Sequence, residues 1–342
     1  MCFPVFVDAS ETKQPSSAAW RFGLGAGIAG ALLVALKYAL RPPTRRRVPE
    51  TISPARFATK VLHTSLGEVL FHEEGRGRLL VFIHGVGLGA SSYEWAEVYP
   101  TFADRYRVIA LDLVGFGESS RPDAHYSAAA YTRMLAEFLR ALGWDEPPIL
   151  IASGLGAGFC AQLASQHPEL VGRLILLMPD GKGDIGRQRL TRFSRTIYRT
   201  PLLARFLYRN HLSTRAAIAH WLRRAVFAEA GRVTDEMIDV FTTCAQQPGA
   251  EYAAVRWMAG ELGLDLESRL AAVPQPVALL WGGAVSARPV EEGYRLQRLS
   301  HSATLTLLPG AGAMPGREKP TETIAALDEL LRSDLRVMLK AG

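Results

Sequence analysis

The chain has 342 residues, of which 48% are hydrophobic and 21% are charged, so it is long enough to bury a sizeable core. Its three cysteines, Cys2, Cys160 and Cys244, lack paired spacing, which excludes a disulfide framework and a zinc site of the usual spacing. We expect neither a metal nor a cofactor. The formal net charge is +6, and the basic residues gather in a few segments.

The first predicted element is an apolar helix that follows an N-terminal tail, residues 1–21. Residues 22–40 read FGLGAGIAGALLVALKYAL, with Lys37 as the single charge. At 1.5 Å per residue a helix of this length spans about 28 Å, close to the thickness of the hydrocarbon core of a bilayer. A buried core helix or a cleaved signal peptide is the alternative, but RPPTRRR follows instead of a cleavage site. We therefore expect a retained single-pass transmembrane helix.

The charges that flank this helix predict its orientation. Basic residues are more numerous on its C-terminal side, so the positive-inside rule places the large C-terminal domain on the cytoplasmic side of the membrane, or on the matrix or stromal side of an organelle. Residues 41–57 are expected to form a basic linker at the surface, with membrane lipid as a partner. A stripe of Gly and Ala at every fourth position in the span also allows a transmembrane-helix or protein-complex partner.

Residues 58–180 and 273–342 are interpreted as two parts of one α/β core. After two alternating runs around a glycine turn, short apolar runs predict buried strands over 79–83, 108–111, 149–151 and 173–179. Helical segments lie between these runs, which is typical of a mostly parallel sheet with helices on both faces. Functional groups are then expected at the carboxyl ends of the strands.

Five blocks of sequence in this order resemble the α/β-hydrolase fold family. The blocks are HGVGLGASSYEW, DLVGFGESSRP, ASGLG with HPELVGRLILLMP, PVALLWGG and LLPGAG. Together they span about residues 58–180 and 270–335. Within the family, the chain resembles the branch of epoxide hydrolases and haloalkane dehalogenases, which have a helical lid. The resemblance implies a Ser-His-Asp type triad whose nucleophile lies in a strand–turn–helix elbow.

Glycine occupies the position of the nucleophile. In the elbow the residues two places before and after the nucleophile are small, and Ala152 and Gly156 meet this condition around Gly154. A frame centred on Ser153 would put two bulky residues at those places. Glycine also adopts the strained backbone of such a turn without a Cβ clash.

The other two triad positions carry apolar residues. Val285 stands where the pattern W-G-x-x-D would place the acid, and Ala313 follows PGAG where the histidine would stand. Without a nucleophile and its base the standard mechanism of the family cannot operate.

The remaining pocket residues are expected at the ends of two strands. His84, Gly85 and Val86 match the oxyanion loop of the family, and Ser153 and Leu155 flank the elbow glycine. His84 is interpreted as a structural or positioning group. Asp180, at the end of the fourth strand, is interpreted as a loop residue or a helix cap.

Residues 181–272 are expected to form the helical lid. Between Lys182 and Arg224 the chain has 11 Lys or Arg and one acidic residue, Asp184. This basic segment is interpreted as a solvated lid surface, a face that lies on anionic lipid, or a surface for a protein partner. No nucleic acid is expected, because no recognition motif is present. An apolar small-molecule ligand is a further expected partner, beneath the lid.

Two functions remain open. The first is a membrane-anchored, non-catalytic protein, a pseudoenzyme that acts as a binding, scaffold or complex-associated subunit. The alternative is a hydrolase-family enzyme of non-standard mechanism that acts on a small apolar or lipid-like substrate. Because triad members act as a unit and all three are replaced, the sequence favours the first function.

Overall fold

A computed structural model describes residues 57–181, 200–284, 288–300 and 302–341, with side chains up to residue 332. The predicted tail, transmembrane helix and nearly all of the linker lie outside these residues. Phe57, the last residue of the predicted linker, is buried with its ring 4.9 Å from that of Tyr99, so the core already includes it. Within the described ranges, no helix is long and apolar enough to cross a bilayer.

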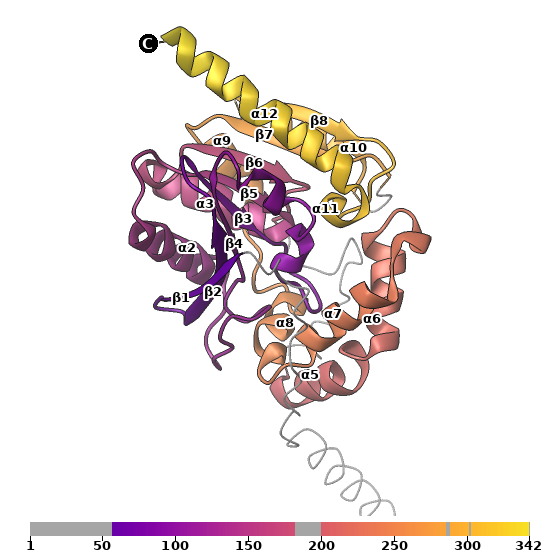
Figure 1. The fold of residues 1–342 in the computed structure, drawn as a ribbon. Helices are drawn as coiled ribbons and strands as arrows, with labels where there is room; N and C mark the ends of the chain where they lie inside the picture. The colour runs from indigo at the N-terminus through magenta and orange to yellow at the C-terminus, as the bar shows by residue number, and fades with distance from the viewer. Residues whose placement is uncertain (1–56, 182–199, 285–287, 301, 342) are drawn as a thin grey trace, which may run out of the picture. The chain divides into compact units, whose positions relative to one another are not determined.

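An eight-stranded sheet forms the centre of the described residues (Figure 1). Its order is β1-β2-β4-β3-β5-β6-β7-β8. β1 and β2 pair antiparallel, β2 pairs antiparallel with β4, and every pair from β4 to β8 is parallel. The prediction of a mostly parallel sheet is therefore confirmed. The strands are β1 (Ala58–His63), β2 (Glu68–Glu74), β3 (Leu79–Ile83), β4 (Arg107–Leu111), β5 (Ile149–Ser153), β6 (Arg173–Leu177), β7 (Val277–Gly282) and β8 (Thr304–Leu308).

The central strands form where the sequence has short runs of branched and aliphatic residues. All five residues of β3, LLVFI, are buried, whereas β1 at the edge of the sheet is mostly exposed. Strands that are covered on both faces need apolar side chains on both, and this explains the continuous rather than alternating pattern. β6 ends at Leu177, two residues before the predicted end, and β5 extends to Ser153.

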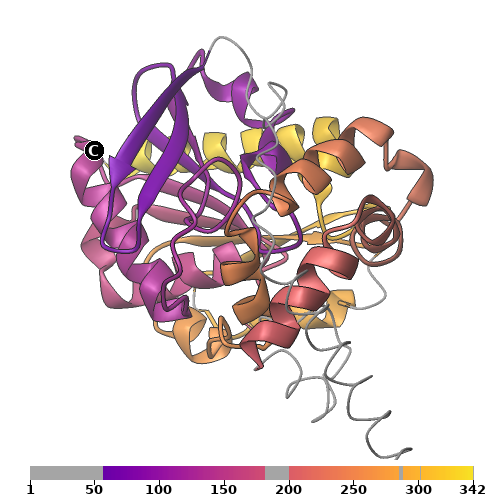
Figure 2. The same cartoon turned by 90° about the horizontal axis from the view of Figure 1, so that it is seen from below.

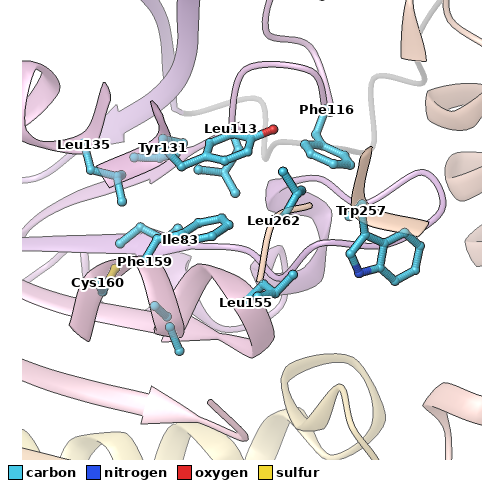
Figure 3. Packing of buried hydrophobic residues seen from close by; sticks show 14 of the residues in the cluster. Ile83, Leu113, Phe116, Tyr131, Leu135, Leu155, Phe159, Cys160, Trp257 and Leu262 are labelled. Atoms are coloured by element: carbon cyan, nitrogen blue, oxygen red, sulfur yellow. The ribbon is translucent and has the colours of Figure 1, made fainter. Parts of the chain in front are cut away.

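Two helical layers cover the sheet. Along β3, Val81 and Ile83 face one layer while Leu80 and Phe82 face the other, as the two-residue period of a strand requires. In the first layer the rings of Tyr131 and Phe159 stack at 4.9 Å (Figure 3). That layer contains α2 (Ala128–Leu142), α3 (Gly154–Gln166), α9 (Leu266–Ala271) and α10 (Val290–Gln297), and the second contains the short helices η2 (Ser92–Trp95) and η3 (Tyr99–Phe102) with α11 (Pro315–Glu318) and α12 (Pro320–Ala341).

The chain between β6 and β7 carries a group of helices that we call the insertion, residues 200–258. It contains α5 (Pro201–Leu207), α6 (Arg215–Trp221), α7 (Asp235–Ala245) and α8 (Ala250–Met258). The insertion stands on the side of the sheet away from β1 and β2 (Figure 2). The lid predicted for residues 181–272 is longer than this unit, because α9 packs against α3 and belongs to the core.

Candidate active site

The turn between β5 and α3 places a glycine in a left-handed conformation. Gly154, the first residue of α3, has φ +50°, which L side chains adopt only with strain. A Cβ built on Gly154 would meet only the Cα of Gly85, at 3.7 Å. The turn therefore has space for a side chain at position 154, and backbone strain is the main obstacle to one.

A second glycine lets the helix come close to the neighbouring strand. A Cβ on Gly156 would lie 2.3 Å from the carbonyl oxygen of His84, which is closer than atoms can approach. The first turn of α3 thus lies directly beside the end of β3. Because the first four N–H groups of a helix have no intrahelical acceptor, the N–H of Leu155 is available at this edge.

His84 follows β3 and holds the loops around it together. Its side chain is fully buried, and Nε2 accepts a hydrogen bond from the Leu113 N–H at 3.0 Å. Nδ1 therefore carries the proton and donates to the Gly85 carbonyl at 2.6 Å. Burial lowers the pKa of His84, and the charge of Asp112 offsets this in part. With both ring nitrogens engaged, the imidazole has a positioning role and is not a base for a ligand.

Glu94 and Ser153 lie next to each other beneath the Gly85 loop. The Gly85 N–H donates to Oε2 of Glu94 at 2.8 Å, and the Glu94 side chain is only 4% exposed. A Cβ built on Gly85 would stand 3.1 Å from Ser153 Oγ and 3.6 Å from Glu94 Oε2. Burial raises the pKa of Glu94 to about 7, against smaller lowering effects of the Ser153 hydroxyl and the Gly85 N–H.

Of the two other triad positions of the family, the structure describes only the second. Val285 lies outside the described residues. Ala313 follows β8, and its N–H donates to the carbonyl of Val226 in the insertion at 2.7 Å. The Ala313 methyl group lines the same cavity as Gly154.

A cavity of about 180 Å³ lies at the carboxyl ends of the strands, between the sheet and the insertion. It brings together all the sequence-predicted site residues of the described chain except the buried His84, namely Gly85, Val86, Ser153, Gly154, Leu155 and Ala313. Its polar side chains are Glu94, Ser153, Asp180 and Arg288. The Arg288 guanidinium donates to the carbonyls of Met178 and Pro179 and to Glu292, so its donors serve the surrounding loops.

The insertion supplies the apolar roof of this cavity. Trp221 at the end of α6 and Trp257 on α8 line it, together with Val226. The Trp221 indole lies against Gly87 so closely that a Cβ on Gly87 would be 2.7 Å from the ring. Trp257 is seen beside Leu155 and Leu262 in Figure 3.

The sequence analysis missed Glu94, Asp180 and the two tryptophans as cavity residues. Asp180 was expected to be a loop residue or cap, yet it lines the cavity. Glu94 offered one signal, since it lies between two large aromatic residues, Tyr93 and Trp95. A carboxyl group in such a place is buried with its neighbours when the turn packs on the sheet.

A larger cavity of about 560 Å³ lies at the opposite end of the strands, near the beginnings of β3 and β4. Arg76, Arg78, Arg107, Trp144, Asp145 and Glu146 contribute to its lining. We do not assign the chemistry to it, because ligands of open parallel sheets bind at the carboxyl ends of the strands. Among the described His, Cys, Asp and Glu residues, no group of three is placed to hold a metal ion.

Several known proteins similar to this chain are named as hydrolases. A 2-hydroxy-6-oxo-6-(2'-aminophenyl)hexa-2,4-dienoic acid hydrolase of Metapseudomonas resinovorans is 27% identical over 260 residues, which are 75% of this chain and 84% of that protein. A 2-hydroxymuconate semialdehyde hydrolase of Pseudomonas sp. (strain CF600) is 39% identical over 31% of this chain and 38% of its own length. The crystal structure of a serine hydrolase involved in carbazole degradation matches with a TM-score of 0.66 at 25% identity, over 81% of this chain and 99% of that one.

These similarities correct the expectation that the chain is not an enzyme. That expectation was wrong, because the relatives and the structural neighbour are named hydrolases and point to an enzyme. The error was to infer a lack of activity from the replacement of three side chains. Their replacement removes one set of catalytic groups, and it says nothing of other ionisable groups that the fold brings into the same cavity.

The family itself is shown by a direct match. Residues 78–311 match the model of the alpha/beta hydrolase fold family, a range that includes β3 to β8, the elbow glycine and the whole insertion. The mostly parallel sheet and the position of the cavity at the carboxyl ends of the strands agree with the sequence-based expectations. The chain belongs to the α/β-hydrolase fold family.

Proposed function

We propose that the protein is a hydrolase that acts on a small, apolar, ester-like substrate without a Ser-His-Asp triad. The observation that carries this proposal is one cavity in which backbone donors, a buried carboxyl group and apolar walls converge. The names of the relatives support a hydrolytic reaction. The insertion acts as the lid in this proposal, since Trp221 and Trp257 cover the cavity.

The cavity provides donors for a substrate carbonyl oxygen. The N–H of Leu155 points from the first turn of α3, where the helix dipole also favours developing negative charge. In the described part of the chain, the N–H of Val86 donates to no other group. Two such donors, aimed at the oxygen on which charge develops, stabilise the tetrahedral state of acyl transfer.

The size and charge of the cavity favour a small, uncharged substrate. Its volume of about 180 Å³ is below the range of about 300–1,000 Å³ that is common for ligand pockets. The curated relatives are named for acid or semialdehyde substrates. A carboxylate on this substrate would lack a cation here, because the donors of Arg288 already hold carbonyl groups and Glu292.

Hydrolysis of p-nitrophenyl esters of increasing acyl length tests this proposal. We expect turnover of acetate and butyrate esters and a steep fall for octanoate and longer chains. Ala313→Phe fills the cavity and should abolish turnover. Ala129→Phe, at an exposed position of α2, is the matched control and should retain it. No turnover across the series, or turnover that survives Ala313→Phe, would contradict the proposal.

We propose in addition that residues 22–40 anchor the enzyme in a membrane. The sequence alone supports this, through a 19-residue apolar run followed by a basic segment.

A further inference from the structure

We propose that Glu94 is the catalytic general base, that it activates a water molecule, and that Gly85 and Ser153 position it. This inference rests on the proposed hydrolase function and assigns its reacting groups. It gives the enzyme a water nucleophile in place of a side chain at the elbow.

The geometry places the Glu94 carboxyl group at the floor of the cavity, beside the elbow. η2 holds the residue between Tyr93 and Trp95, both of which are buried. One oxygen, Oε2, accepts the Gly85 N–H, and no charged group of the described chain contributes to the pKa of Glu94. A buried carboxyl group without a cation costs stability. A role in the reaction explains why this position carries a carboxyl group in spite of that cost.

Other ionisable groups near the cavity are less suited to be the base. His84 has both ring nitrogens in hydrogen bonds to backbone groups. Arg288 cannot accept a proton. Asp180 is partly exposed on the loop after β6, where its backbone N–H donates to the Gly154 carbonyl at 2.8 Å. Among the cavity-lining residues that the structure describes, Asp180 is therefore the competitor, and the experiment below includes it.

Burial, and not a charged neighbour, determines the pKa of Glu94. Its pKa of about 7 results from desolvation, with only neutral groups acting against it. A base with a pKa near the working pH combines a deprotonated form with useful basicity. The ionisable groups on the elements around Glu94 are His84, Asp112, Asp180, Arg288, Glu97, Arg317 and Glu318. Arg317 pairs with Glu97 at 2.9 Å and donates a hydrogen bond to the Tyr93 hydroxyl at 2.7 Å.

The step balances with water as the only co-reactant. The Glu94 carboxylate takes a proton from water as the water oxygen forms a bond to the substrate carbonyl carbon. The carbonyl π electrons move to its oxygen, which accepts hydrogen bonds from the N–H groups of Leu155 and Val86. When the C=O bond re-forms, the bond to the leaving oxygen breaks and that oxygen takes the proton from Glu94. The products are a carboxylic acid and an alcohol, and Glu94 is again a carboxylate.

Ser153 is a positioning residue in this scheme. It is 2% exposed, and its Oγ is enclosed without a hydrogen bond of ordinary geometry. The hydroxyl nevertheless lies near enough to Glu94 to lower its pKa. In this role the hydroxyl fixes the carboxyl group and favours its charged form.

The pH dependence of ester hydrolysis by the full chain tests the assignment. For wild type we expect kcat/KM to rise with pH to a plateau, with a midpoint near 7. Glu94→Gln should lose about 100-fold or more, the usual contribution of a general base. Ser153→Ala should move the midpoint to higher pH, because a contact that lowers the pKa is removed. Glu169→Gln, at a surface position 60% exposed, is the matched control and should match wild type.

Two results would overturn the role of Glu94 while leaving the hydrolase proposal intact. One is wild-type activity and midpoint in Glu94→Gln, with the loss found in Asp180→Asn instead. The other is a single turnover in H₂¹⁸O whose acid product carries no ¹⁸O, because a carboxylate nucleophile would transfer its own oxygen first. Absence of any wild-type turnover counts against the hydrolase proposal instead. Infrared titration then still tests Glu94: a carboxyl band that titrates near pH 7 and is missing in Glu94→Gln is expected, and its absence refutes the assignment.

Discussion

Replacing Glu94 by glutamine should stabilise the fold at alkaline pH and not at acidic pH. The folded-state pKa of Glu94 is raised from 4.5 to about 7 by burial. The folded protein therefore holds this proton more tightly than the unfolded chain, so wild-type stability falls as pH rises from about 4.5 to about 7. At about 1.4 kcal/mol for each pH unit between 4.5 and about 7, the whole loss is about 3 to 4 kcal/mol. Glutamine keeps an acceptor for the Gly85 N–H but does not ionise.

Denaturant unfolding at pH 5 and pH 8, followed by tryptophan fluorescence, measures this effect. Part of the loss has already occurred at pH 5, so the gap in unfolding free energy between Glu94→Gln and wild type should widen by about 2 to 3 kcal/mol between pH 5 and pH 8. Glu169→Gln should show no such pH-dependent gap, because its carboxyl group is largely exposed. A gap of equal size at both pH values would mean that Glu94 is charged in the fold at pH 5, and the reasoning from burial would fail.

Three further outcomes are expected. Gly154→Ser should lower the unfolding free energy by about 1–3 kcal/mol, because φ +50° strains any side chain; an unchanged denaturant midpoint would mean that this turn is unstrained. Fluorophosphonate probes should not label the protein even while it hydrolyses esters, since Ser153 Oγ is enclosed; labelling of Ser153 detected by peptide mass spectrometry would make serine the nucleophile. The full chain should remain in the membrane fraction after alkaline carbonate washing, whereas a chain that lacks residues 1–45 should not; release of the full chain would refute a spanning helix over residues 22–40.

The sheet was the most predictable part of the molecule. Runs such as LLVFI over 79–83 are too short for a helix and apolar throughout, which is the pattern of a strand covered on both faces. The order of the strands in the sheet cannot be predicted in the same way. Periodicity predicts each strand but not its neighbours, so the order of the strands came from the structure.

The candidate site was predictable only where backbone geometry defines it. Gly154, Gly85 and Leu155 stand at fixed places relative to strand ends, and the structure brings them to one cavity. Glu94 was missed because a charged residue beside a turn is exposed in most proteins, and only packing of η2 on the sheet buries it. The mistaken expectation of no enzyme had the same origin, because it weighed only the residues at the family's own triad positions.

The contact between Gly87 and Trp221 determines how thick a substrate can be. The indole rests on a position without a side chain, and any Cβ there would be only 2.7 Å from the ring. Any side chain at position 87 would therefore require the Trp221 ring to shift. Because both residues line the cavity, a substitution at this glycine would change the width of the cavity without altering Glu94 or the elbow.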